Sequence, residues 1–191
     1  MEFLKNFFIK WFLRIKLLAF LFALWAVIFS VSNVLGLKAA FEYDDAAAYT
    51  GDSFRSAIKT YPNFPPQEKA SEFCEKDRKK ISPYLTSFIL KFFGFKIHLI
   101  ADRPKENASC LIKRWENDFE KIFFTADSQE KYSIIEKNGY LLYFSAYDDG
   151  IIQAQKAGVK AFRISRNKNS AAEYDYSPGK FSEKTLPLSY L

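Results

Sequence analysis

The chain has 191 residues, a formal net charge of +6 and 49% hydrophobic residues, and it begins with a long apolar stretch. Half of the net charge lies before that stretch, in a short basic arm, and the rest is dispersed. No stripe of Lys and Arg stands out, which argues against a nucleic-acid partner. The one basic run, at 76–80, is expected to be the solvated end of a helix.

The uncharged stretch from Leu17 to Leu37 predicts a transmembrane helix. At about 1.5 Å per residue it spans about 32 Å, enough to cross a hydrocarbon core. The basic arm, residues 1–16, is expected in the cytoplasm or at the interface by the positive-inside rule. The protein is then a single-pass membrane protein with lipid around its helix, and its remaining residues lie in the periplasm or at the cell surface.

Two alternatives to an anchor remain. A cleaved signal peptide would need a cut near Ala39 and Ala40, but the apolar run is longer than the usual 7–15 residues of a signal peptide. A buried core helix is disfavoured, because no polar stripe interrupts the run before Ser30. Cleavage would also cut into the first predicted strand, which begins at Leu37. The short connection predicts a domain, and a site, close to the membrane surface.

Residues 38–191 fit one domain. Short apolar runs alternate with helical periodicity, which is typical of an α/β fold with a parallel, Rossmann-like sheet of about five strands flanked by helices. The predicted strands are 37–43, 96–100, 121–125, 140–145 and 159–165. The predicted helices are 82–93, 107–115, one ending before Gly139, and 149–157. Residues 46–81 are expected to form a small cap-like insertion, and the tail after Asn167 has no clear periodicity.

In the helix predicted after Ser82, which is expected to be its N-cap, Leu85, Phe88, Ile89 and Phe92 line one face.

Cys74 and Cys110 are too few for a disulfide framework and lack metal-ligand spacing. They permit one bridge if the domain lies outside the cytoplasm. The single histidine, His98, lies within an apolar strand pattern and is expected to be a packed core residue rather than a catalytic one.

Carboxylates follow four of the predicted strands, in the segments 42–45, 102, 127 and 148–149. The carboxyl ends of parallel strands meet at one edge of a sheet, where ligands bind. Converging carboxylates repel one another unless a cation lies among them, so the pattern favours Mg²⁺ together with a phosphate. The alternative is that each Asp caps the helix that follows it.

The motifs at these strand ends resemble those of haloacid dehalogenase (HAD) superfamily phosphatases, and residues 38–191 together resemble the class B acid phosphatases. FEYDD (41–45) resembles the D-x-D motif, IADRP (100–104) the T-G-R motif, and SAYDDGI (145–151) the metal-binding motif. FRISRNKNS (162–170) and PGKFSEK (178–184) are similar to the family's tail. The resemblance allows an oligomer, since the family is often tetrameric.

The resemblance assigns a role to each matched position. Glu42 takes the place of the nucleophile, Asp44 that of the general acid and base, and Lys131 that of the phosphate-neutralising lysine. The phosphate-binding positions are Ala101, Asp102 and Arg103, and the metal positions are Glu42, Asp44 and Asp148. A family magnesium ligand is replaced by Ala146, so any Mg²⁺ site is weakened.

Three alternative functions are compatible with these residues. The first is a membrane-anchored acid-phosphatase-like domain that is catalytically impaired and keeps at most phosphate or phosphomonoester binding, because Glu42, Ala101 and Ala146 depart from the motifs. The second is an active Mg²⁺-dependent phosphatase with Glu42 as nucleophile, or as a metal ligand with an activated water. The third is a structural or partner-binding membrane protein, whose strand-end cleft would be filled by aromatic side chains such as Tyr43, Tyr49 and Tyr147.

Overall fold

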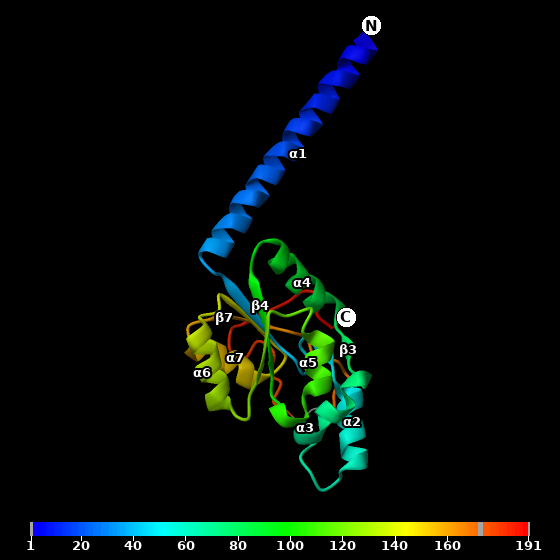
Figure 1. Ribbon diagram of the computed structural model, residues 1–191, viewed down its shortest axis with the longest axis vertical. Coiled ribbons are helices and arrows are strands. Elements are labelled where there is room, and N and C mark those ends of the chain that lie inside the picture. Colours follow the sequence, from blue (N-terminus) through cyan, green and yellow to red (C-terminus); the bar gives the residue numbers. More distant parts are fainter. Residues whose placement is uncertain (1, 172–173, 191) are drawn as a thin grey trace.

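The computed structural model describes residues 2–171 and 174–190, with side chains from residue 11 onward, and shows a long helix projecting from an α/β domain (Figure 1). The helix, α1, runs from Glu2 to Val34. Its segment Trp11–Val34 is long and apolar enough to cross a membrane, a property that a signal sequence shares. Helix α1 includes the basic arm and ends three residues before the predicted boundary, and Gly36, with φ of 60°, lies in the turn that leads to the domain.

A six-stranded, wholly parallel sheet forms the centre of the domain, in the order β5-β4-β1-β6-β7-β8. Its strands are β1 (Lys38–Glu42), β4 (Lys96–Ala101), β5 (Lys121–Phe124), β6 (Leu142–Ser145), β7 (Lys160–Arg163) and β8 (Lys184–Thr185). The Rossmann-like fold predicted from the sequence is therefore confirmed. The prediction of about five strands missed β8, because a two-residue strand has no periodicity to detect.

Helices cover both faces of the sheet. Helices α4 (Ile81–Phe92) and α5 (Ser109–Trp115) lie on one side of it, and α6 (Ser128–Asn138) and α7 (Asp148–Lys156) lie on the other, whereas α2 (Gly51–Thr60) and α3 (Pro66–Lys69) belong to the insertion. Phe41 of β1 lies in a core with Trp115 of α5. Its neighbour Ala40 lies in a second core with Ile135 of α6 and Ile151 of α7. Because side chains alternate along a strand, Glu42 is directed to the side of α6 and α7.

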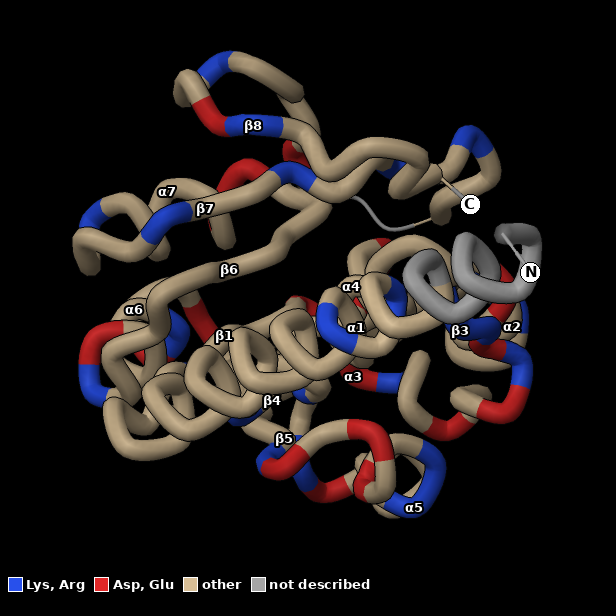
Figure 2. Tube along the Cα trace, turned by 90° about the horizontal axis from the view of Figure 1, so that it is seen from above, with Lys and Arg blue, Asp and Glu red and all other residues tan. Residues whose placement is uncertain are grey.

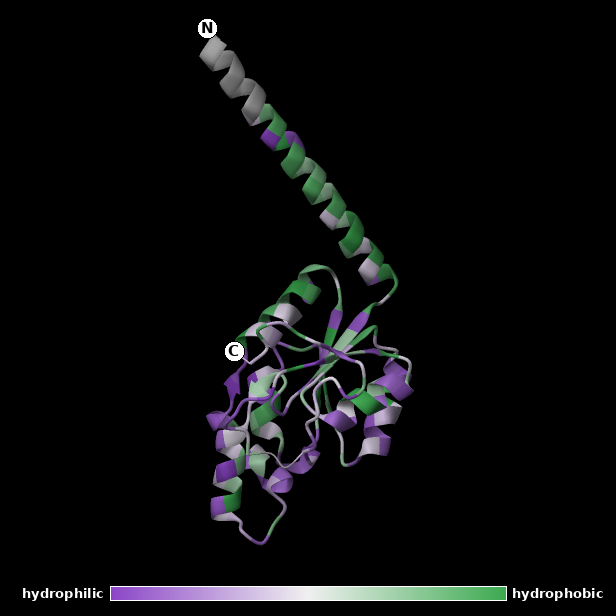
Figure 3. Cartoon of the chain, turned by 180° about the vertical axis from the view of Figure 1, so that it is seen from behind, coloured by the Kyte–Doolittle hydropathy of each residue, from purple (hydrophilic) through white to green (hydrophobic). Residues whose placement is uncertain are grey.

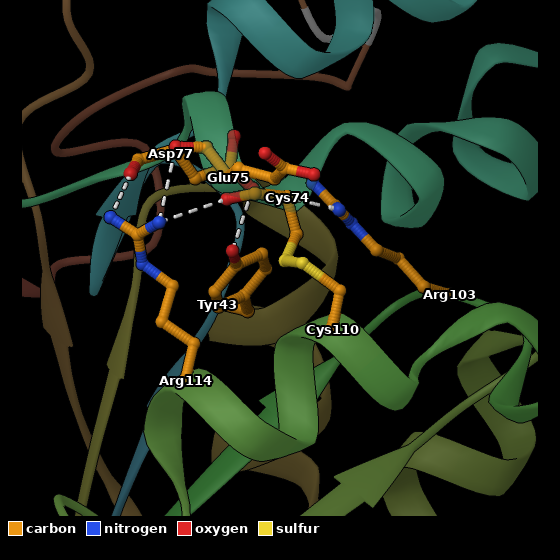
Figure 4. The surroundings of a disulfide bond; sticks show 7 residues. All are labelled: Tyr43, Cys74, Glu75, Asp77, Arg103, Cys110 and Arg114. Carbon is orange, nitrogen blue, oxygen red and sulfur yellow. Dashed lines mark hydrogen bonds and ion pairs between the residues drawn. A yellow bond between two sulfur atoms is a disulfide. The ribbon is translucent and has the colours of Figure 1, made fainter.

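The segment predicted as a cap contains β2 (Ala48–Tyr49), α2, α3, the 3₁₀ helix η1 (Ala70–Lys76) and β3 (Arg78–Lys79). A disulfide between Cys74 and Cys110 joins η1 to α5 (Figure 4). Beside it, Tyr43 donates a 2.6 Å hydrogen bond to Asp77, and Arg114 donates to the carbonyl oxygen of Asp77 at 2.6 Å. The insertion is thus fixed to α5 and to the residue that follows β1.

His98 and the start of α4 were both predicted from local sequence patterns. His98 is buried, as expected, and its Nδ1 lies 2.9 Å from the Tyr140 hydroxyl. Helix α4 begins at Ile81 with Lys80 as the N-cap residue, so Ser82 is not its cap. Gly94, with φ of 85°, follows the end of α4 as predicted.

The carboxyl edge of the sheet lies away from α1. Strand β1 starts at Lys38, four residues after α1 ends, and runs into the domain (Figure 1). Its five residues place Glu42 on the order of 15 Å further from α1. The expectation that the strand-end site lies close to a membrane surface neglected the direction of the first strand, which places the site at the edge of the sheet away from α1 (Figure 1).

Candidate functional site

Glu42, at the position of the family nucleophile, has its carboxylate buried against β6. The register that pairs Phe41 with Phe144 sets Ser145 beside Glu42, and Tyr143 lies on the same face two residues earlier. Tyr143 donates a hydrogen bond to Oε1 of Glu42 at 3.0 Å, and Ser145 donates to Oε2. Only 2% of Glu42 is exposed, so its carboxylate is held within the α6/α7 layer.

Gly150, in the first turn of α7, makes room for this orientation. A Cβ atom added to Gly150 would lie 2.1 Å from Oε1 of Glu42 and 2.5 Å from Oγ of Ser145. Any side chain here would have to displace the glutamate. The missing side chain at Gly150 therefore leaves room for Glu42, whose side chain is longer than that of the Asp at this position of the D-x-D motif.

Lys131 of α6 is the cation at the centre of this carboxylate cluster. Its Nζ lies 3.0 Å from Glu42, 2.7 Å from Asp102 and 2.7 Å from Asp149. The hydroxyl of Thr125 donates to the other oxygen of Asp102 at 2.5 Å. One ammonium group is thus shared by three carboxylates, whose charges raise the pKa of Lys131 well above its usual value despite its burial.

The pKa of Glu42 is raised from 4.5 to about 7. Burial is the largest cause, and the nearby Lys131 ammonium opposes it. A substantial fraction of Glu42 is therefore protonated at neutral pH. A protonated carboxyl group is a poor nucleophile.

Asp44, at the general acid and base position, is bound to Arg103. The Nη2 atom of Arg103 lies 2.6 Å from Oδ1 of Asp44, and its Nε lies 3.2 Å from the same oxygen. Both side chains are almost completely buried. The guanidinium also lies over the Tyr43 ring, 4.8 Å from its centroid. Burial raises the pKa of Asp44, against the opposing effect of Arg103.

Two arginines of the tail motif lie beside two further strand-end carboxylates, Asp148 and Asp45. Arg163, fully buried, lies 2.9 Å from Asp148 and 2.8 Å from Glu183, and so connects α7 to the segment before β8. Arg166 lies 3.8 Å from Asp45. Asp45 also accepts a 2.6 Å hydrogen bond from the Tyr147 hydroxyl.

These pairings leave a poor set of ligands for Mg²⁺. Glu42, Asp44 and Asp148 are bound to Lys131, Arg103 and Arg163, respectively. Within residues 2–171 and 174–190, no three acidic, His or Cys side chains are grouped so that they could hold a metal ion. Protein cations occupy the positions between the carboxylates that a metal ion would need. The residues present therefore do not fit the magnesium site that the resemblance implies.

A cleft of about 970 Å³ opens beside this cluster, at the ends of β4 and β5. Its lining residues include the polar Asp102, Arg103, Lys131 and Asp149, and α3 of the insertion forms part of its wall. Glu42 and Asp44 are not among its lining residues. The cleft thus reaches the phosphate-binding positions but stops short of the nucleophile and acid/base positions.

The aromatic side chains expected to fill the cleft are distributed differently. Tyr147 lines the cleft together with Tyr174, and Tyr49 lines a separate pocket of about 410 Å³. Tyr43 is fully buried beneath Arg103. The cleft is therefore walled by aromatic rings but still open.

The structure brings together some of the predicted positions and separates others. Glu42 and Asp102 converge on Lys131, whereas Ala101 is fully buried in the core and cannot contact a ligand in the cleft. The roles of Tyr143 and Gly150 were not recognised from the sequence. Tyr143 and Ser145 share one face of β6 by period-two alternation, so the strand pattern contained a signal for two of Glu42's partners.

Neither a protein-family model nor a curated protein matches this sequence. Solved structures match it by fold. CbbY from Rhodobacter sphaeroides, in complex with phosphate, has a TM-score of 0.57 and 9% identity, over 80% of this chain and 94% of that one. A structure described as a β-phosphoglucomutase from Thermotoga maritima has a TM-score of 0.56 and 12% identity, over 81% and 95%. A haloacid dehalogenase-like hydrolase from Bacteroides fragilis has a TM-score of 0.52 and 13% identity, over 79% and 97%.

Identities this low establish the fold alone. The chain has the parallel, Rossmann-like fold of the HAD superfamily hydrolases. The fold is compatible with phosphoryl hydrolysis or transfer, and the chemistry of this chain has to be argued from its own site.

Proposed function

We propose that this protein is a membrane-anchored HAD-fold domain that does not hydrolyse phosphomonoesters and acts as a binding module. The observation that carries the proposal is the Glu42 carboxylate, which is held by Tyr143, Ser145 and Lys131 outside the cleft. A nucleophile has to lie within about 3–3.5 Å of the atom that it attacks. A phosphomonoester in the cleft has no such access to Glu42.

The active alternative requires more than a movement of Glu42. Asp44 would have to leave a buried, bidentate pair with Arg103 in order to exchange protons with a leaving group. Removing a partner from a buried ion pair costs about 3–5 kcal/mol. The geometry therefore favours the impaired domain over the phosphatase that uses Glu42 as nucleophile or metal ligand.

The charge of the cleft bears on what it binds. Six acidic residues line it against three basic ones, and the ammonium of Lys131 is already shared by three carboxylates. The acidic lining residues are Glu68, Asp102, Glu106, Asp127, Glu130 and Asp149, and the basic ones are Arg103, Lys105 and Lys131. Such a lining repels phosphate, so phosphomonoester binding is weak and a ligand with a positive or neutral group is preferred.

The open cleft supports a binding role over a purely structural one. Its volume, about 970 Å³, lies at the upper end of the usual range for small-molecule sites. The rings of Tyr147 and Tyr174 in its wall give a ligand apolar surface to contact.

The location follows from α1 and from the disulfide. An uncleaved α1 would anchor the chain in a membrane with its N-terminus in the cytoplasm and its domain on the other side. A disulfide between Cys74 and Cys110 persists in an oxidising compartment such as the periplasm or the cell surface. Both features support an extracytoplasmic domain.

Within the HAD superfamily, we place the domain nearest the class B acid phosphatases. The support comes from the contacts that the two tail motifs make. Arg163 of FRISRNKNS binds Glu183 of PGKFSEK, and Ser170 of the first motif donates a hydrogen bond to Asp45. The first part of the tail therefore binds strand-end carboxylates directly, and the second part is joined to them through Arg163.

The proposal is tested by aryl phosphate hydrolysis with the full chain in detergent, at pH 4–8, with and without Mg²⁺. The expected rate equals that of the Asp44→Asn variant under every condition. Turnover in the wild-type chain that Asp44→Asn abolishes would overturn the proposal. Replacing Glu42, Ala101 and Ala146 with Asp, Thr and Asp tests the assignment of these positions, since some activity is expected to return.

A further inference from the structure

Helix α4 carries its apolar face on the outside of the domain. Its exposed side chains occur at intervals of three and four residues and are all apolar or aromatic, with exposed fractions from 40% to 69%. They are Ile81, Tyr84, Leu85, Phe88, Ile89 and Phe92. Pro83 and Ser87 are the buried residues of this helix, which reverses the usual arrangement of a surface helix.

The C-terminal end of α4 contacts α1. The indole of Trp25 stacks on the ring of Phe92 with centroids 5.1 Å apart, and its Nε1 donates a 2.9 Å hydrogen bond to the carbonyl oxygen of Phe92. Gly94 lies so close to α1 that a Cβ added to it would be 2.7 Å from the carbonyl oxygen of Phe29. Figure 1 shows α4 beside the base of α1, and Figure 3 shows hydrophobic colouring on both helices.

This contact fixes the depth of α4 relative to the apolar segment. Trp25 lies nine residues before Val34, the last residue of α1, or about 14 Å along the helix axis. Phe92 is therefore level with the apolar segment Trp11–Val34 rather than with the domain below it. If α1 crosses a bilayer, the end of α4 cannot remain outside the membrane.

The charge distribution agrees with this placement. Lys91 is the one charged residue of α4, and it is half-buried, with its amine donating to the carbonyl oxygen of Asp118. Viewed from above, α4 is mostly uncharged, whereas acidic and basic residues are frequent in the rest of the domain (Figure 2). The exposed Leu188 extends the apolar surface, since the adjacent Pro187 accepts a 3.0 Å hydrogen bond from Ser82.

We propose that the exposed face of α4 lies in a lipid surface, with Leu85, Phe88 and Phe92 inserted among the acyl chains next to α1. This inference rests on the proposed anchoring by α1. An amphipathic helix in this position binds through its apolar face and lies in the plane of the interface. The domain would then be held in one orientation, with the cleft at its opposite edge open to the aqueous compartment.

The test is electron paramagnetic resonance of nitroxide labels on the full chain in phosphatidylcholine–phosphatidylglycerol vesicles. Labels are attached to single cysteines introduced as Leu85→Cys or Phe88→Cys, with the native disulfide intact. Leu21→Cys reports on α1, and Gln129→Cys, on the exposed start of α6, is the aqueous control. Collisions with oxygen are expected to exceed collisions with a water-soluble nickel chelate at positions 85, 88 and 21, and the reverse is expected at 129.

The outcomes separate the two proposals. A lipid-like label at 21 with water-like labels at 85 and 88 would overturn the α4 proposal and leave the anchor standing. Labels at 85 and 88 that are shielded from both reagents would indicate a second protein copy on this face, and would also overturn it. A water-like label at 21 would reject the anchor and the α4 proposal together.

Discussion

Tyr143 donates a 3.0 Å hydrogen bond to the carboxylate of Glu42, at the position where the resemblance to HAD phosphatases places an attacking oxygen. The hydroxyl belongs to β6, and the glutamate to the neighbouring β1. The bond directs the carboxylate into the α6/α7 layer, where Lys131 and Gly150 complete its surroundings.

Replacing Glu42 with Gln should change how stability depends on pH. The wild-type pKa is about 7 in the folded chain and 4.5 in the unfolded chain, so the folded state holds its proton more tightly. That contribution, about 3 kcal/mol, is complete below pH 4.5 and is lost as the pH rises through 7. Relative to Glu42→Gln, the wild-type chain should thus lose stability between pH 4.5 and 7.

Denaturant unfolding of both chains at several pH values measures this difference. Asp77, whose pKa burial raises to about 6, titrates in both chains and cancels in the comparison. Parallel stability curves from pH 4.5 to 8 would show that Glu42 is ionised like an exposed carboxylate, contrary to the structure.

Gly150→Ala should destabilise the domain through Glu42. The added methyl group would lie 2.1 Å from Oε1 of Glu42, and overpacking of this kind costs about 1–3 kcal/mol. In a Glu42→Ala background the nearest obstructing atom is gone and only Oγ of Ser145, 2.5 Å from the added Cβ, remains, so the same glycine substitution should cost less. A double-mutant cycle from urea unfolding gives the coupling. Equal costs in the two backgrounds would contradict the packing described here.

Asp149→Asn should create affinity for phosphate. The substitution removes one of the three carboxylates that share Lys131 and keeps the shape of the side chain. Releasing part of the lysine charge toward the cleft should strengthen phosphate binding about tenfold or more. Calorimetric titration with inorganic phosphate measures the change. The control is Glu106→Gln, which removes a charge from the same cleft at a residue that does not bind Lys131; an equal gain there would mean that overall charge, not Lys131, is responsible.

The Arg163→Met substitution should lower the free energy of unfolding of the domain. The guanidinium is fully buried between Asp148 and Glu183, and its removal leaves both carboxylates without their cation. Loss of one partner from a buried pair costs about 3–5 kcal/mol. Arg55→Met is the matched control, because Arg55 pairs with Asp52 at an exposed position worth about 0–1 kcal/mol. Similar losses for the two variants, measured by urea unfolding, would show that Arg163 is not a structural connection.

Periodicity in the sequence was enough to predict the sheet and most of its helices. The strands β1 and β4 have continuous apolar patterns, and Gly139 and Gly158 end helices where expected, each with a positive φ. Strand β8 was missed because its two residues show no periodicity, and its pairing with β7 is a contact between segments that are distant in the sequence. No local pattern encodes such a contact.

The sequence predicted where the candidate site lies but not how its side chains are arranged. Topology alone brought the strand-end acids to one edge, and the resemblance pointed to Lys131 and Asp102. What the sequence did not reveal is which cation neutralises which carboxylate. Mg²⁺ was the expected cation, whereas Lys131, Arg103 and Arg163 take that role in the structure. The outward apolar face of α4 was likewise hidden, because periodicity identifies an apolar stripe without saying what it contacts.

The central claim is that the Glu42 carboxylate is withheld from the cleft, and covalent trapping tests it most directly. The full chain is incubated with an aryl phosphate and Mg²⁺, quenched in acid and digested, and the peptide that contains Glu42 is examined by mass spectrometry for a phosphoryl group. The structure predicts no phosphorylated Glu42 at any pH from 4 to 8. A phosphoryl adduct on Glu42 that is absent from the Glu42→Gln chain would contradict it.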